Sequence, residues 1–135
     1  MIEVNVKHEG GVKFEIETRG HKLVSDQPAQ DGGTDQGMTP PEIFLGGLAS
    51  CAAYYAAAYL KKKKLERPGV HVRVRAEKVG PPAHLDSILI EVDVPGPLSD
   101  ADRAGIEDSV HRCLIHQTML RTPTIEIELN TPVSA

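Results

Sequence analysis

The chain has 135 residues, of which 40% are hydrophobic and 25% are charged, as is typical of soluble globular proteins. This length predicts a single domain, residues 1–135, that can bury a core without a metal or a disulfide. The net charge of −4 and the absence of Trp argue against nucleic-acid and membrane-surface partners. The N-terminal residues do not resemble a secretory signal, and no stretch approaches the roughly 20 apolar residues of a transmembrane helix. We therefore expect a cytoplasmic protein with reduced thiols.

Alternation of apolar and polar residues marks the N-terminal part of the chain. Residues 2–18 alternate on both sides of Glu9-Gly10-Gly11, which predicts a β-hairpin. Residues 21–26 predict a third short strand, and the glycine-rich residues 31–37 predict a loop. Three antiparallel strands are thus expected before the first helix.

A long apolar helix is predicted from Thr39 to about Lys64. Thr39 suits the N-cap, Pro40 the first helical position, and Glu42 the third, which completes a capping box. Residues 67–69, Arg-Pro-Gly, end the helix. Its apolar residues run nearly all the way round, so the helix needs more cover than one sheet and one helix supply. We therefore expect a homodimer.

The second half of the chain predicts a hairpin, a helix and a final strand. Residues 70–77 and 87–94 alternate as strands, and Ser99 caps a helix that extends to about Leu120. Residues 124–129 predict a last strand with its apolar side chains facing inward. The order β-β-β-α-β-β-α-β is that of an α+β fold with antiparallel sheet and two helices.

The chain has two cysteines, and the pattern predicts each of them inside a helix. Cys51 follows the small residues of LGGLAS, and Cys113 lies 62 residues later. They could be inert apolar fillers of the core. They could also be a redox pair, in which one thiolate attacks a peroxide and the second thiol resolves the sulfenic acid. Cys51 lies three turns past Thr39, beyond the main reach of the helix dipole, so a guanidinium would be the simplest way to stabilise its thiolate.

A metal site is the other arrangement that these residues suggest. His111, Cys113 and His116 together with Cys51 offer four possible zinc ligands. Positions 111 and 113 project from different faces of a helix, and no CxxC or HExxH motif occurs. We therefore expect neither a metal nor another cofactor. A Cys-His hydrolase is a further possibility, although no nucleophile elbow is present.

Two segments resemble one known family. Residues 35–51, DQGMTPPEIFLGGLASC, resemble the signature of the OsmC/Ohr family, the osmotically induced and organic hydroperoxide resistance proteins. Residues 111–120, HRCLIHQTML, resemble its second-cysteine segment, with Leu114 where many members have proline. The resemblance implies an OsmC-like fold, with antiparallel sheets around two central helices, in an intertwined homodimer whose active sites lie at the subunit interface.

The same resemblance implies a cysteine-based peroxidase that reduces organic hydroperoxides to alcohols. Cys51 would be the peroxidatic thiol and Cys113 the resolving thiol, with an external dithiol of lipoyl or thioredoxin type reducing the Cys51–Cys113 disulfide. Glu42 matches the family glutamate that orients an arginine against the thiolate, and Arg19 is the candidate for that arginine. Glu42 could equally serve the capping box alone, and Arg19 could be a surface charge. A non-catalytic redox sensor or small-molecule-binding protein of the same fold is the alternative.

Overall fold

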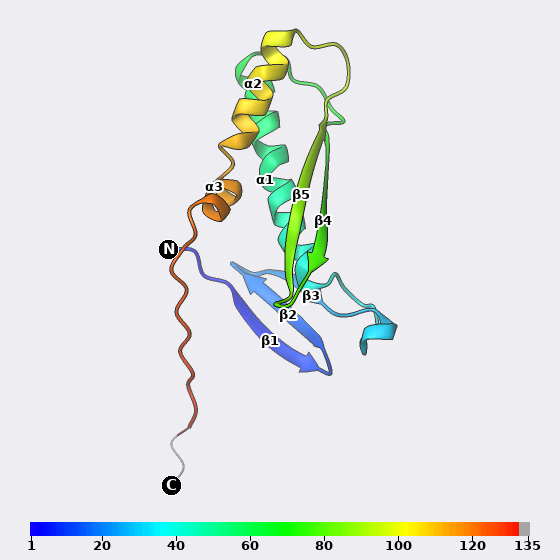
Figure 1. Cartoon of the computed structure of the whole chain (residues 1–135), viewed down its shortest axis with the longest axis vertical. Helices are drawn as coiled ribbons and strands as arrows, with labels where there is room; N and C mark the ends of the chain where they lie inside the picture. Colours follow the sequence, from blue (N-terminus) through cyan, green and yellow to red (C-terminus); the bar gives the residue numbers. More distant parts are fainter. Residues whose placement is uncertain (133–135) are drawn as a thin grey trace.

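The computed structural model describes residues 1–132, which form an α+β fold with two antiparallel sheets and three α-helices (Figure 1). The first sheet has the order β1-β2-β3, and the second is the hairpin of β4 and β5. The strands are β1 (Asn5–Gly10), β2 (Lys13–Thr18), β3 (His21–Ser25), β4 (His71–Val79) and β5 (His84–Asp93). These five strands lie where the alternation predicts them, and the α+β class is confirmed.

The loop between β3 and α1 is organised by one buried carboxylate. Asp26 is 1% exposed and accepts hydrogen bonds from the backbone N–H groups of Gln27, Thr34 and Gln36 and from the Thr34 hydroxyl, at 2.8–3.3 Å. The hydrogen bond from Gln27 is the main cause of a lowered Asp26 pKa. The loop contains the short 3₁₀ turn η1 (Ala29–Asp31) and delivers the chain to the start of the first helix.

Helix α1 (Pro40–Lys62) begins with the predicted capping box. The Thr39 hydroxyl accepts from the Glu42 N–H at 3.4 Å, and the Glu42 carboxylate accepts from the Thr39 N–H at 2.9 Å. The helix ends two residues before the predicted Lys64. Local capping chemistry therefore sets its start as expected.

The buried residues of α1 form one stripe along the helix and belong to the hydrophobic core. Its buried residues recur every fourth position and pack against α2 (Asp100–His111) and β4: Leu48, Ala52, Ala56 and Leu60. Ala56 and Leu60 meet the buried Ile106 of α2, and Val92 of β5 also packs against the cluster. The other faces of α1 are partly or fully exposed within residues 1–132, although they are also apolar.

By length and composition α1 could cross a membrane, so the expectation that no stretch is long and apolar enough is wrong. Core helices of soluble proteins share these properties, and α1 packs against α2, β4 and β5 along its buried stripe. Only 22% of its most apolar window is buried. The helix thus has a large apolar surface that residues 1–132 do not cover.

The predicted second helix is broken into α2 and α3 (Leu114–Leu120), so the expectation of two helices is wrong. The N–H groups of Arg112 and Cys113 bond to carbonyls three residues back, at 3.1 and 3.0 Å, which tightens and ends α2. Cys113 then turns away with ψ 131° and becomes the N-cap of α3. Cys113 consequently lies between the two helices and not inside one.

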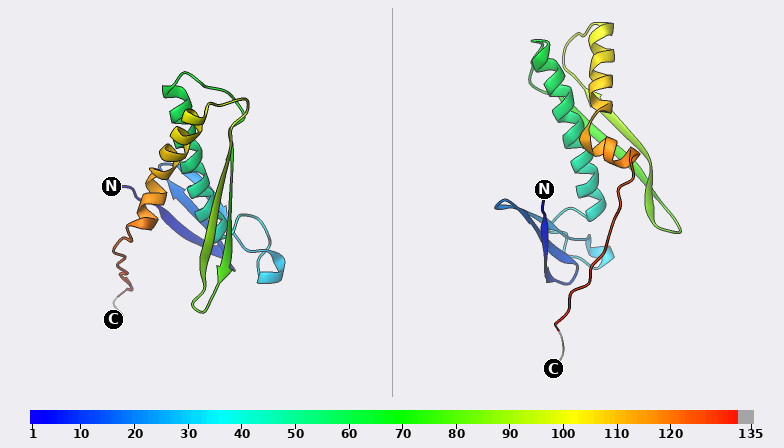
Figure 2. Two further views of the ribbon diagram at one scale, coloured as in Figure 1. Left: turned by 45° about the horizontal axis from the view of Figure 1, so that its top comes forward. Right: turned by 90° about the vertical axis from the view of Figure 1, so that its left-hand side faces the viewer.

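The predicted strand at residues 124–129 is not formed in the described chain. Ile125, Ile127 and Leu129 are 79%, 91% and 87% exposed, so they do not face inward as expected. The chain beyond α3 extends as an irregular tail (Figure 2). An alternating pattern predicts which face of a strand is apolar, but it does not predict which other strand pairs with that strand. No strand within residues 1–132 pairs with residues 124–129.

The α1–α2 contact generates a stability prediction at Gly105. A Cβ at this position would overlap the Tyr59 ring, whose hydroxyl donates to Asp102 at 2.9 Å. Gly105→Ala should lower the free energy of unfolding by about 1–3 kcal/mol through overpacking, in spite of the better helix propensity of alanine. The matched control is Gly46→Ala, where a Cβ meets no atom within 4 Å, and which should leave stability unchanged or higher. Urea denaturation measures both, and equal stabilities would contradict the contact.

Candidate redox site

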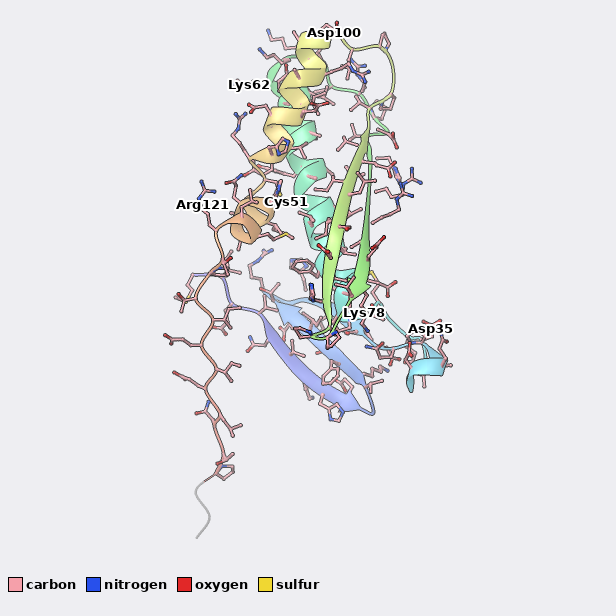
Figure 3. All side chains as sticks on the ribbon, in the orientation of Figure 1. Asp35, Cys51, Lys62, Lys78, Asp100 and Arg121 are labelled. Atoms are coloured by element: carbon pink, nitrogen blue, oxygen red, sulfur yellow. The ribbon has the colours of Figure 1, made fainter. Side chains whose placement is uncertain are left out.

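The two thiols meet where α1 packs against the start of α3. The Cys51 thiol lies close enough to the Cys113 thiol to raise the Cys113 pKa, and both cysteines are free. Figure 3 labels Cys51 beside α3. Cys51 is half-buried, whereas Cys113 is only 1% exposed. The fold thus joins two cysteines 62 residues apart and leaves one of them more accessible than the other.

The Cys113 thiol has a raised pKa. Burial is the main cause and the hydrogen bond with Cys51 is the second, while the backbone N–H groups of His116 and Ile115 act in the opposite direction. Those N–H groups belong to the first turn of α3, where Cys113 is the N-cap. Cys113 is therefore a neutral thiol at neutral pH. The sequence did not reveal this N-cap position, because no Gly or Pro marks the helix break.

Glu42 and Arg19 are not brought together within residues 1–132. The Glu42 carboxylate is engaged by Thr39, whose N–H and hydroxyl both donate to Oε1 at 2.9 Å. These bonds, the backbone one first, lower the Glu42 pKa and keep it ionised. Arg19 occupies the exposed turn between β2 and β3 with φ 51°. The capping function of Glu42 is thus established, and its function towards an arginine remains a prediction.

A cavity of about 540 Å³ opens between β5 and helices α2 and α3. One wall is lined by Ile88, Ile90 and Val92 of β5 and by Val94, which directly follows the strand. The polar lining comes from two helices: Arg103, Glu107 and His111 of α2, and His116 of α3. Leu48, one turn before Cys51, also lines it, as does His116, one turn after Cys113. The cavity therefore ends about one helical turn from the thiols.

Arg103 and Glu107 were not predicted as site residues from the sequence. Their signal is the spacing of Arg103, Glu107 and His111, which recur every fourth residue and share one face of α2. Among the described side chains, no group of three or more His, Cys, Asp or Glu residues is placed to hold a metal ion. His111 and His116 do lie together, with ring centroids 5.6 Å apart.

Comparison with known proteins identifies the fold and the family. Residues 33–128 match the family model described as OsmC-like protein. The chain belongs to the OsmC-like family. Its expected membership is thereby confirmed, and both cysteines fall inside the matched region. No significant match is found among curated protein sequences.

Solved OsmC-like structures are similar over most of the chain. An osmotic stress induced and detoxification response protein from Psychrobacter arcticus has a TM-score of 0.80 at 15% identity, covering 87% of this chain and 88% of that one. An OsmC-like protein from Mycoplasma pneumoniae gives 0.76 at 18% identity, with 90% and 89% covered. An organic hydroperoxide resistance protein OsmC from Legionella pneumophila gives 0.68 at 18% identity, with 88% of each covered. At these identities the likeness shows the fold.

The unequal exposure of the thiols predicts unequal alkylation. At neutral pH, iodoacetamide should modify Cys51 well before Cys113, because Cys113 is buried and has the raised pKa. Modification of Cys113 should accelerate as the pH rises, since more of it is then thiolate. Peptide mass spectrometry over time measures both sites, and the urea-unfolded chain, in which they should react alike, is the control. Faster labelling of Cys113 in the folded chain would contradict the geometry.

Proposed function

We propose that the protein is a thiol peroxidase that reduces organic hydroperoxides to alcohols. The observation that supports this most is the pair of adjacent free thiols, one half-buried and one fully buried. A peroxide can reach the first thiol, and the second is held next to it for disulfide formation. The structurally similar OsmC protein from Legionella pneumophila is named an organic hydroperoxide resistance protein, and this name agrees with the proposed chemistry.

In the proposed reaction the Cys51 thiolate attacks the distal oxygen of the hydroperoxide. The O–O bond breaks, the alcohol leaves with a proton, and Cys51 becomes a sulfenic acid. The Cys113 sulfur then attacks the Cys51 sulfur, an S–S bond forms, and the hydroxyl leaves as water. An external dithiol reduces the disulfide by thiol–disulfide exchange. We assign to Arg19 the stabilisation of the Cys51 thiolate and to Glu42 the orientation of Arg19.

We also propose that the protein works as a cytoplasmic homodimer. Every residue of β1 is exposed, Tyr54 on α1 is 70% exposed, and the apolar residues of the tail are uncovered. A second copy would bury these surfaces together. Under this proposal the active site lies at the interface, where Arg19 reaches the Cys51 thiolate.

The peroxidase proposal predicts the behaviour of two serine variants. With cumene hydroperoxide and dihydrolipoamide, the wild-type protein should consume peroxide continuously. Cys51→Ser should fall to the rate of the dithiol alone, because the attacking sulfur is missing. Cys113→Ser should react once and then accumulate Cys51 sulfenic and sulfinic acid, seen by mass spectrometry. Unimpaired turnover by Cys51→Ser would disprove the mechanism.

The apolar cavity supports a second candidate, a non-catalytic protein that binds a small apolar molecule or senses oxidants. The same assay separates the two functions. Absence of wild-type turnover with several dithiols would favour this second candidate. A Cys51–Cys113 disulfide that forms with peroxide but is not turned over would favour the sensor in particular.

The dimer proposal predicts a mass of twice the 14.6 kDa chain in sedimentation equilibrium. Ile127→Glu should shift the protein towards the monomer, because it places a charge on the apolar face of the tail. Glu126→Gln, a change on the opposite face of the same segment, should leave the dimer intact. A monomeric wild-type protein at micromolar concentration would contradict the proposal.

A further inference from the structure

His116 has a buried nitrogen without a partner. Its Nδ1 is inaccessible to solvent and makes no hydrogen bond within residues 1–132. The ring lines the 540 Å³ cavity and lies beside the ring of His111. A buried polar atom without a hydrogen bond is costly, so such an atom in a native protein calls for an explanation. The neighbouring thiols offer an explanation.

His116 and Cys113 share the first turn of α3. Cys113 is the N-cap and His116 is the third residue of the helix, so the two residues lie about one helical turn apart. The His116 N–H already acts on the Cys113 sulfur. The same turn therefore carries the buried thiol and the unpaired imidazole nitrogen.

The buried thiol needs a proton acceptor. A thiolate is the effective nucleophile, and Cys113 is held as the neutral thiol by burial and by Cys51. Around His116 the cavity has Arg103, Glu107 and His111 from α2, whereas α1 and β5 contribute only apolar side chains to it. Glu107 and His111 are exposed, and Arg103 cannot accept a proton. His116 is the proton acceptor whose free nitrogen is buried, and it lies three residues after Cys113.

We propose that His116 Nδ1 accepts the proton of the Cys113 thiol, through one water in the cavity, as Cys113 attacks the oxidised Cys51. The inference deepens the proposed peroxidase function, on which its last step rests. The Cys113–Cys51 bond forms, the bond from Cys51 sulfur to oxygen breaks, and the proton passes from His116 to the leaving hydroxyl, which departs as water. Cys113 is oxidised and the Cys51 sulfur is reduced, so no further reactant is needed.

The test isolates the attack of Cys113 from peroxide chemistry. The chromogenic disulfide dithiobis(nitrobenzoate) should react with Cys51 and release one coloured thiolate, after which Cys113 displaces a second one. In His116→Gln the second release should be about tenfold slower or more at neutral pH, with the first unchanged. The slowed release should accelerate about tenfold per pH unit, as direct deprotonation of Cys113 by hydroxide requires.

Two further variants distinguish proton acceptance by His116 from a structural function of this residue. His111→Gln removes the neighbouring exposed imidazole and should behave like the wild-type protein. His116→Ala should be slow and should be accelerated by added imidazole, which a purely structural function of His116 does not predict. A second release as fast in His116→Gln as in the wild type would overturn the proposal, as would the absence of rescue by imidazole with the variant folded by circular dichroism.

The outcome is independent of the peroxidase assay. If the wild type fails to consume peroxide while His116→Gln slows the second release, the proposed function fails and His116 stays the proton acceptor of the thiol pair. If peroxide is consumed and the second release is unaffected, His116 loses this function and the peroxidase proposal stands.

Discussion

The close packing of α1 on α2 is the constraint on which the rest of the structure depends. Ala52 and Ala56 are fully buried in this contact, and Gly105 leaves room for the Tyr59 ring. The Ser109 hydroxyl donates to the Tyr55 carbonyl at 3.0 Å, so a hydrogen bond ties the helices together. Small side chains let helix axes approach closely. That approach brings the chain leaving α2 against the middle of α1, where the two thiols meet.

Structural features that depend on residues close together in the sequence could be predicted from the sequence. The capping box at Thr39 and the first five strands follow from local chemistry and from period-two alternation. The break at Cys113 was not predictable, because the residues around it favour a continuous helix. At the break the Cys113 side chain is 1% exposed and neighbours Cys51 of α1, a tertiary arrangement that local sequence does not encode. The cysteine pair was therefore predictable, but not the N-cap position that sets its chemistry.

The C-terminal tail illustrates the second limit of sequence-based prediction. Ile125, Ile127 and Leu129 alternate with polar residues, which correctly indicates one apolar face and says nothing of the pairing partner. Strand pairing is a long-range property, and a strand without a partner cannot satisfy its backbone groups in a sheet. β1 and the outer faces of α1 are likewise exposed because no other segment of residues 1–132 packs on them. Residues 124–129 were predicted to face inward, whereas α1 was expected to need more cover than the chain supplies, and within residues 1–132 all of these surfaces are exposed.

Glu42 can cap the helix and orient an arginine at the same time. Both hydrogen bonds from Thr39 go to Oε1, and within residues 1–132 no hydrogen bond reaches Oε2. The carboxylate stays ionised, because these bonds lower its pKa. Its second oxygen is thus open to a guanidinium, which binds carboxylates readily. The chain itself joins the thiols, while Arg19 lies on an exposed turn. In the proposed homodimer, a second copy of the chain would supply the arginine and cover the exposed apolar surfaces together.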